Sequence, residues 1–440
     1  MRSKINSLLM IACAFLMGAC FSCCSKIADL SHFHDFVQHN APEKQQTLSD
    51  TVCLYVDYST CVAEAKNSEF FKSTHPSIVD ASPIFYSIKG SVIKKETEDR
   101  QQVYNLLSNI REVNHADIKG AVAQIVKGNH QAVLITDGEY YMQGNVRDNL
   151  NNPYLADEFR KWLNKGYDIY FYCEPYLESN KFNKYRYYIL FTDDAIDENI
   201  NDRFSRSASA EDYDVTMFHL CDGQVRIKMH EKYPLNKNVS PSENCQVKNG
   251  VDVQEYYLKW DDMAAYLKEG DIEDTYILRG LFVDNSEANS YKMEEITPVV
   301  YQLYPEYQAY YDSFTLGTAL PKAKEFKELK ELFVIDEDIF EETGEIVMKL
   351  HPDFDGYGDL SAEHPNLLKV DFVITEAENN FTKNEDLSEA FTWNSISAAN
   401  GHAKNTSLYE SISQILKSSK NNPAKRKVVL YTVYISTYNI

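Results

Sequence analysis

The sequence predicts an α/β protein in which a mostly parallel, doubly wound sheet is followed by a second, β-rich domain. Short apolar runs alternate with amphipathic helical patterns from residue 51 to about residue 200, and strand-like runs dominate beyond about residue 245. A loop-rich stretch separates the two patterns. Strands that alternate with helices are typical of parallel sheets with helices on both faces. We therefore expect a first domain over residues 51–245 and a second over residues 246–440.

The N-terminus predicts an exported lipoprotein. Arg2 and Lys4 precede the apolar stretch 8–16, which is too short for a transmembrane helix. The Met-Gly-Ala-Cys sequence that ends at Cys20 resembles a bacterial lipobox. We expect residues 1–19 to be a signal peptide, Cys20 to be acylated, for example with palmitate, and residues 20–50 to form a tether. An ordinary secretory signal that contains a cysteine is the alternative.

The charge balance argues against one class of partner. The chain has 44 basic and 66 acidic side chains, a formal net charge of −22. Such a chain repels phosphate backbones, so we expect no nucleic-acid binding. The carboxylates are available to divalent cations.

Hydrophobic periodicity predicts the elements of the first domain. The Lys-Gly pair at 89–90 indicates a hairpin turn, Thr97 could cap a helix, and Gly166 is a typical helix stop. The predicted strands lie at 52–56, 83–88, 91–95, 132–136, 167–173 and 185–191. The predicted helices lie at 61–73, 98–110, 118–126, 153–165 and 196–204.

Strand-like runs predict an α+β or β-sandwich module for the second domain. Its predicted strands lie at 276–282, 296–303, 332–334, 346–350, 368–374 and 428–436. Two helices are predicted at 261–267 and 408–417.

Polar residues follow three buried-looking strands of the first domain. Asp57, Asp137 and Glu174 stand where these predicted strands end. Ligands of α/β sheets bind at the carboxyl ends of strands. Mg²⁺ prefers about six oxygen ligands, some of them water. Asp57, Ser59 and Asp137 supply such oxygens and predict a possible metal site. The alternative is that both aspartates cap the helices that follow them.

Two motifs carry a resemblance to a known family. The sequence Val-Asp-Tyr-Ser-Thr-Cys at 56–61 resembles the Asp-x-Ser-x-Ser motif of von Willebrand factor A-type domains, and Leu-Ile-Thr-Asp-Gly at 134–138 resembles the later Thr-Asp-Gly strand of that family. The resemblance covers roughly residues 50–205. It implies a Rossmann-like fold and a metal-ion-dependent adhesion site that binds Mg²⁺ and is completed by an acidic residue of a protein partner.

The resemblance transfers five metal ligands to this chain: Asp57, Ser59, Thr60, Asp117 and Asp137. Two positions depart from the family pattern, because its second serine falls on Cys61 and its threonine on Ala116. Thr60 and Asp117 are the neighbouring oxygen donors.

The expected function is protein–protein recognition or adhesion at the bacterial cell envelope, on the periplasmic side or at the cell surface, through a lipid-anchored protein. A metal-dependent envelope hydrolase is the alternative, with Asp57 as nucleophile or ligand and His115 or His130 as acid/base. A purely structural component of the envelope is a third possibility.

Overall fold

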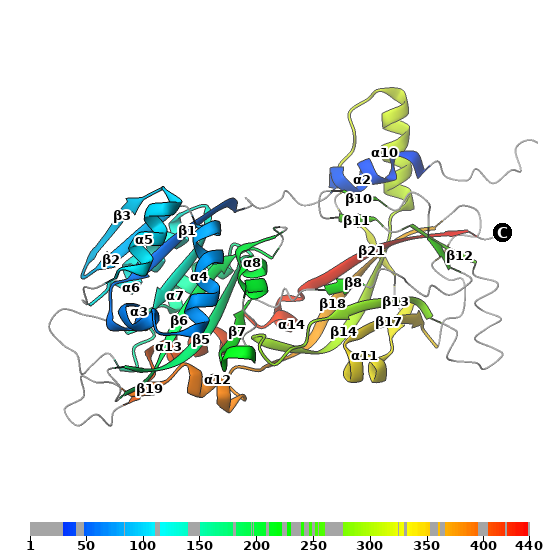
Figure 1. Ribbon diagram of the computed structural model, residues 1–440. Helices are drawn as coiled ribbons and strands as arrows, with labels where there is room; N and C mark the ends of the chain where they lie inside the picture. Colours follow the sequence, from blue (N-terminus) through cyan, green and yellow to red (C-terminus); the bar gives the residue numbers. More distant parts are fainter. Residues whose placement is uncertain are drawn as a thin grey trace, which may run out of the picture.

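The computed structural model describes most of the chain in two lobes (Figure 1). The described residues are 30–40, 48–82, 84–110, 115–139, 150–178, 182–194, 196, 198–207, 211–221, 227–229, 239–241, 246–248, 251–253, 255–259, 276–323, 325–329, 332–352, 360, 366–394, 404–418 and 420–438. The signal peptide and Cys20 lie outside them. No helix in this part of the chain is long and apolar enough to cross a membrane.

The first lobe is built on a mixed sheet of seven described strands. Its order is β3-β2-β1-β4-β6-β5-β7. The strands are β1 (Ser49–Asp57), β2 (Ile84–Lys89), β3 (Val92–Thr97), β4 (His130–Thr136), β5 (Asp168–Glu178), β6 (Phe182–Thr192) and β7 (Thr216–Leu220). The protein is therefore α/β at this level, as predicted, and each predicted strand of the first domain is present.

The direction of the strands corrects one prediction. Only β1–β2 and β1–β4 pair in parallel, whereas β2–β3, β4–β6, β5–β6 and β5–β7 pair antiparallel. The expectation of a mostly parallel sheet is wrong, because β5 and β6 form a long hairpin. Only residues 179–181 separate these two strands, and a crossover to a parallel strand needs a dozen residues or more.

Helices cover both faces of this sheet. They are α3 (Thr60–Ala65), α4 (Glu69–Ala81), α5 (Arg100–Ser108), α6 (Ile118–Lys127), α7 (Ala156–Leu163) and α8 (Ile200–Ser207). Apolar side chains of α3, α4, α5 and α8 pack with Val52, Leu54 and Val56 on one face of β1. Those of α6 and α7 pack with Cys53 and Tyr55 on the other face. The alternation along β1 is the period of two expected for a strand with both faces buried.

The second lobe is rich in β-structure. Its larger described sheet has the order β15-β14-β18-β21-β12-β9, and its smaller one β16-β17-β13-β8. Their strands are β8 (Ile227–Met229), β9 (Val239–Pro241), β12 (Glu255–Lys259), β13 (Tyr276–Val283), β14 (Tyr291–Gln302), β15 (Lys327–Leu329), β16 (Phe333–Ile335), β17 (Glu345–Leu350), β18 (Asn366–Asn379) and β21 (Val429–Tyr438). A separate pair comprises β10 (Gln246–Lys248) and β11 (Val251–Val253). The helices α10 (Tyr304–Leu316), α11 (Glu337–Thr343) and α14 (Pro423–Arg426) complete the lobe. The predicted helix at 261–267 lies outside the described residues.

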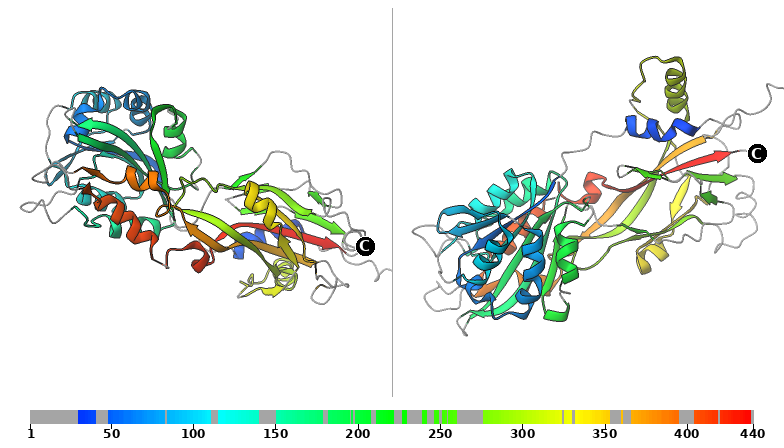
Figure 2. Two further views of the ribbon diagram at one scale, coloured as in Figure 1. Left: turned by 90° about the horizontal axis from the view of Figure 1, so that it is seen from below. Right: turned by 45° about the horizontal axis from the view of Figure 1, so that its top comes forward.

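The chain returns to the first lobe after β18. The returning elements are α12 (Glu385–Ala390), β19 (Trp393–Asn394), β20 (Lys404–Asn405) and α13 (Ser407–Leu416). Leu408, Ile412 and Ile415 join the core that contains α7, and Ser411 accepts a hydrogen bond from the backbone of Leu155. Figure 2 shows this orange and red segment against the sheet of the first lobe. A single boundary near residue 245 therefore does not separate the two lobes.

The predicted tether also contains a packed segment. Residues Leu30–His32 form a turn of 3-10 helix, and α2 (Phe33–Asn40) follows it. Phe33, Phe36 and Val37 are buried against Tyr307 and Tyr310 of α10. Residues 30–40 thus belong to the second lobe, and this part of the tether prediction is wrong because their apolar face finds an aromatic partner.

Candidate functional site

The structure brings Asp57, Ser59 and Asp137 together at one edge of the first sheet. Because β1 and β4 are parallel neighbours, their carboxyl ends meet. A carboxylate oxygen of Asp57, one of Asp137 and the Sγ atom of Cys61 all lie within 4.8 Å of one another. Asp57, Ser59, Cys61 and Asp137 are all buried. These four residues are the candidate site, which we call the Asp57 site.

Hydrogen bonds from the Thr-Asp-Gly turn and the residue after it fix the two aspartate side chains. Thr136 Oγ1 donates to Asp57 Oδ2 at 2.8 Å, and Asp137 Oδ1 accepts from the backbone N–H of Glu139 at 2.9 Å. Gly138 has a φ of +71°, and an added Cβ there would meet the rings and methyls of Tyr187 and Leu408 at 3.1–3.3 Å. Glycine is therefore required in the Thr-Asp-Gly turn.

The helix-cap alternative does not account for Asp57. The N-cap residue of α3 is Ser59, and its hydroxyl makes no capping hydrogen bond. Instead the Ser59 hydroxyl lies 3.1 Å from Cys61 Sγ. Oδ1 of Asp57 is buried and has no hydrogen-bond partner of good geometry among the described residues. A buried acceptor without a donor is costly, and a bound cation or proton would satisfy it.

Burial and mutual repulsion raise the pKa values of the site. Burial is the main cause for Asp57, and the charge of Asp137 adds to it, whereas the hydroxyls of Thr136 and Ser59 act in the opposite direction. Burial and the charge of Glu139 raise the pKa of Asp137 to about 7, against the opposing charge of Lys184. Burial also raises the pKa of the Cys61 thiol well above its usual value. Without a cation, the aspartate pair therefore retains a proton near neutral pH.

Cys61 changes the chemistry of the donor set. Two carboxylates and a hydroxyl are oxygen donors that suit Mg²⁺, but a cysteine sulfur suits a softer cation such as Zn²⁺. A metal-bound cysteine is a thiolate, so an ion here would have to displace the proton of Cys61. The residues fit a divalent cation that accepts mixed oxygen and sulfur ligands.

One of the predicted ligands, Asp117, lies elsewhere. Asp117 is the N-cap of α6, and its Oδ1 accepts from the Gly120 amide at 2.8 Å. Ala116, at the family's threonine position, forms a bridge with Gly90. Asp117 does not belong to the described groups of residues that could hold a metal. Thr60 is the first residue of α3 and follows Ser59 directly.

The two histidines of the hydrolase alternative also lie apart from the site. His130 begins β4, a strand of seven residues, whereas Asp137 follows its last residue. A strand of this length separates them by about 20 Å. His115 is also absent from the described group around Asp57.

The β5–β6 hairpin surrounds the Asp57 site with buried ion pairs. Arg186 donates to Glu174 Oε2 at 2.6 Å and to the backbone oxygen of Cys61 at 2.8 Å. Lys184 Nζ lies 2.8 Å from a carboxylate oxygen of Glu178 and 2.8 Å from one of Glu139. The hairpin thus contacts α3 through Arg186 and contacts Glu139, which follows the Thr-Asp-Gly turn, through Lys184.

Sequence reasoning missed these cations, although a pattern indicates them. Lys184 and Arg186 alternate along β6 with the same period of two as Tyr188 and Leu190, so all four lie on one face of the strand, and this face is buried. Positively charged side chains on a buried face of a strand need partners. This alternation predicts acidic neighbours for the two cations. Glu174 is one of them, although its position in the sequence indicates only the end of a strand.

A cavity of about 600 Å³ opens beside the hairpin. Its walls come from the hairpin and from the returning segment: Pro175, Tyr176, Leu177, Asn183, Lys184, Tyr185, Glu389, Thr392, Trp393 and Lys404. The Tyr176 hydroxyl is buried and has no hydrogen-bond partner among the described residues. The cavity therefore offers aromatic surfaces and the exposed amine of Lys404.

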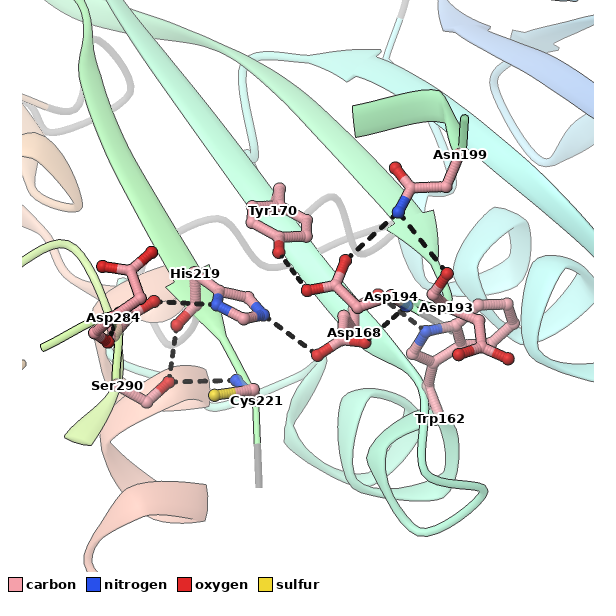
Figure 3. Close-up of polar contacts among 11 residues, drawn as sticks. Trp162, Asp168, Tyr170, Asp193, Asp194, Asn199, His219, Cys221, Asp284 and Ser290 are labelled. Carbon is pink, nitrogen blue, oxygen red and sulfur yellow. Dashed lines mark hydrogen bonds and ion pairs between the residues drawn. The ribbon is translucent and has the colours of Figure 1, made fainter. Parts of the chain in front are cut away.

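A second group of metal-ligand residue types is a closed hydrogen-bond network. Asp168 Oδ1 lies 3.0 Å from His219 Nε2 (Figure 3). Asn289 Oδ1 lies 2.8 Å from His219 Nδ1. Asp194 accepts from Tyr170 at 2.6 Å and from Asn199 at 3.2 Å. Each of the three possible ligands, Asp168, Asp194 and His219, already has a partner. We interpret this group as structural.

Comparisons with known proteins add no family to these observations. No protein-family model, curated protein or solved structure matches the chain.

Proposed function

We propose that this chain is a lipid-anchored protein of the bacterial cell envelope whose first lobe is a recognition module similar to von Willebrand factor A-type domains. The convergence of Asp57, Ser59, Cys61 and Asp137 from two parallel strands is the observation that carries the proposal. In this proposal the Asp57 site holds a divalent cation. The cysteine favours Zn²⁺ over the Mg²⁺ that the family resemblance implies.

The burial of the site shapes how a partner would be recognised. Asp57 exposes 1% of its surface and Asp137 exposes 7%, so a partner carboxylate has little direct access to an ion between them. The cavity beside the hairpin is a better contact surface. An acidic group of the partner would meet the exposed Lys404, and apolar groups would meet Tyr185 and the exposed Leu177. The cation would then act by fixing the edge of the sheet beneath that surface.

Isothermal titration with Zn²⁺, Mn²⁺, Mg²⁺ and Ca²⁺ tests the metal part of the proposal. Asp57→Asn and Asp137→Asn should each abolish the binding of the ion that the wild type prefers, because each removes a charged ligand. Asp117→Ala is the matched control and should retain that binding, because Asp117 caps α6. Wild-type affinity that is unaffected by either Asn substitution would contradict the metal site.

A pulldown from envelope extract tests the recognition part. Lys404→Glu should weaken capture of the partner, whereas Lys94→Glu, on the exposed strand β3, should not. Capture should also weaken with a chelator and recover with the preferred ion. A partner that is retained equally by Lys404→Glu would place the contact surface elsewhere.

A further inference from the structure

The end of α10 and the turn after it form an exposed apolar segment. Phe314, Leu316 and Leu320 expose 46%, 76% and 38% of their surface. Residues 313–321 contain no charged side chain, and Lys322 and Lys324 follow directly. In a chain with a net charge of −22, this segment, which we call the α10 tip, stands out as uncharged and apolar, with Asp312 before it and Lys322 after it.

The α10 tip is held away from the rest of the second lobe. Tyr307 and Tyr310, nearer the start of α10, are buried and anchor the helix. Gly317, with a φ of +66°, ends it in a left-handed cap. Figures 1 and 2 show α10 projecting from the lobe, with α2 across its base. Leu316 therefore faces solvent at the end of a firmly attached helix.

The tip also lies beside the start of the folded chain. The centroid of the His32 ring, just before α2, lies 4.0 Å from the centroid of the Phe314 ring. Cys20 precedes Leu30 by ten residues, which span at most about 35 Å when fully extended. A lipid on Cys20 would therefore hold the α10 tip within reach of the bilayer surface.

We propose that the α10 tip is a second membrane contact, in which Phe314, Leu316 and Leu320 enter the interface of the bilayer that holds the anchor at Cys20. The exposed Lys322 would meet the phosphates of the lipid headgroups. The two contacts together would fix the orientation of the protein on the membrane, which a flexible anchor alone leaves free. This inference rests on the lipid anchor of the proposed function.

Quenching by brominated lipid tests this contact in the full-length acylated protein. Leu316→Trp places a fluorophore at the tip, and Val92→Trp is the matched control, because Val92 is an exposed apolar residue of β3 in the other lobe. Both proteins are reconstituted into vesicles of dibrominated phosphatidylcholine with one-fifth phosphatidylglycerol. We expect the tryptophan introduced at position 316 to lose more than half of its emission and the one at position 92 to lose almost none. An equal loss of emission at the two positions, each measured relative to the wild type with its three native tryptophans, would overturn the proposal.

Vesicle flotation separates the tip from the anchor. Cys20→Ser should abolish stable flotation if Cys20 carries the lipid. If Cys20→Ser floats like the wild type and position 316 is still quenched, the membrane contact holds and the anchor fails. If the wild type floats and position 316 is not quenched, only the tip proposal fails, and if nothing floats, both fail. Gel filtration of the acyl-free Cys20→Ser protein detects the competing partner, because a dimer that Leu316→Glu dissociates would assign the tip to a second copy of the chain.

Discussion

Cys61 decides which cation the Asp57 site can hold. Its thiol lies against the Ser59 hydroxyl, and a carboxylate oxygen of Asp57 and one of Asp137 lie within 4.8 Å of its sulfur. A serine at the same place would offer a hard oxygen ligand in a smaller side chain. The identity of one atom therefore separates a site for Zn²⁺ from a site for Mg²⁺.

We expect Cys61→Ser to change the metal preference of the site. The affinity for Zn²⁺ should fall at least tenfold and the affinity for Mg²⁺ should rise, because an oxygen donor replaces sulfur. Competition titrations with the two ions measure the ratio. Cys53, a buried thiol of β1 outside the site, provides the control, because Cys53→Ser should leave the ratio unchanged. An unchanged ratio in Cys61→Ser would remove Cys61 from the ligands.

Asp117 should matter for stability and not for metal binding. Its carboxylate satisfies an N-terminal amide of α6, and loss of such a cap costs about 1 kcal/mol. We expect Asp117→Ala to reduce the free energy of unfolding by about this amount, with Asp117→Asn close to wild type, since asparagine caps equally well. Urea unfolding followed by circular dichroism measures both variants. Equal losses in the two would argue against the cap.

At the scale of elements, the β5–β6 hairpin is the feature that determines the site's surroundings. It extends beyond the ends of β1 and β4 and carries Arg186 and Lys184 into a buried environment. Removal of one partner of a buried ion pair leaves an uncompensated charge, whereas an exposed pair contributes little.

We expect Arg186→Met to destabilise the first lobe by about 3–5 kcal/mol, because Glu174 is then buried without its cation. The double variant with Glu174→Gln should recover much of this loss. Lys94→Met, which breaks the exposed Lys94–Glu96 pair, should cost less than about 1 kcal/mol. Denaturant unfolding compares the three. A loss in Arg186→Met no larger than that in Lys94→Met would contradict the importance of the buried pair.

Local patterns predicted the elements of the first lobe better than their directions. The run 52–56 and the run 132–136 are strands because both faces are apolar, and the Asp-Gly after the second marks its end. The run 185–191 also reads as a strand, but nothing in its own composition gives its direction. Residues 176–184 are largely polar and therefore resemble a loop in the sequence, although most of them belong to β5 and β6 and the connection between these strands is short. Residues 61–73 form two helices because Ser68 caps a new one, α4.

At the scale of the whole molecule, His219 joins the two lobes. It belongs to β7 of the first sheet, and its backbone and ring contact Ala288 and Asn289, just before β14 of the second lobe. Asn289 Nδ2 donates to the backbone oxygen of Asp284, so its Oδ1 faces His219. Both ring nitrogens of His219 therefore face acceptors, Asp168 and Asn289, and the ring is best satisfied as an imidazolium.

The junction at His219 should weaken as the pH rises. Burial alone lowers the pKa of His219, but the hydrogen bond and charge of Asp168 outweigh it, so the folded-state pKa exceeds the ordinary value. Burial also raises the pKa of Asp168, to about 6. The stabilisation that His219 contributes is complete below about pH 6.5 and is lost as the pH rises through its folded-state pKa, whereas the raised pKa of Asp168 costs stability at lower pH, between about pH 4 and 6.

We expect wild type to lose stability between pH 6.5 and the pH at which His219 is neutral, and His219→Gln to lose much less over the same range. The difference between the two proteins isolates His219, because His75 and His130 have lowered pKa values and oppose it only at acidic pH. Hydrogen exchange at residues 284–290 is the local readout. Identical pH profiles for the two proteins would refute the imidazolium.

Contacts distant in sequence could not be predicted from local patterns. Helix 408–417 is clear from its periodicity, but its apolar stripe does not say that it packs on α7 of the first lobe. Likewise, Phe33 and Phe36 lie in polar sequence, and only the presence of Tyr307 and Tyr310 explains their burial. The Asp57 site was predictable because it uses strand ends whose neighbours follow from topology.

The return of α13 to the first lobe has a consequence for how the protein is made. Synthesis proceeds from the N-terminus at roughly 5–20 residues per second, and domains usually fold in that order. The first sheet ends with β7 at Leu220, but the helix that covers α7 ends at Leu416. For about 10–40 s after β7 emerges, the nascent chain therefore exposes the apolar surface that Leu408, Ile412 and Ile415 later cover. A molecular chaperone that covers this surface during that interval should increase the yield of folded protein.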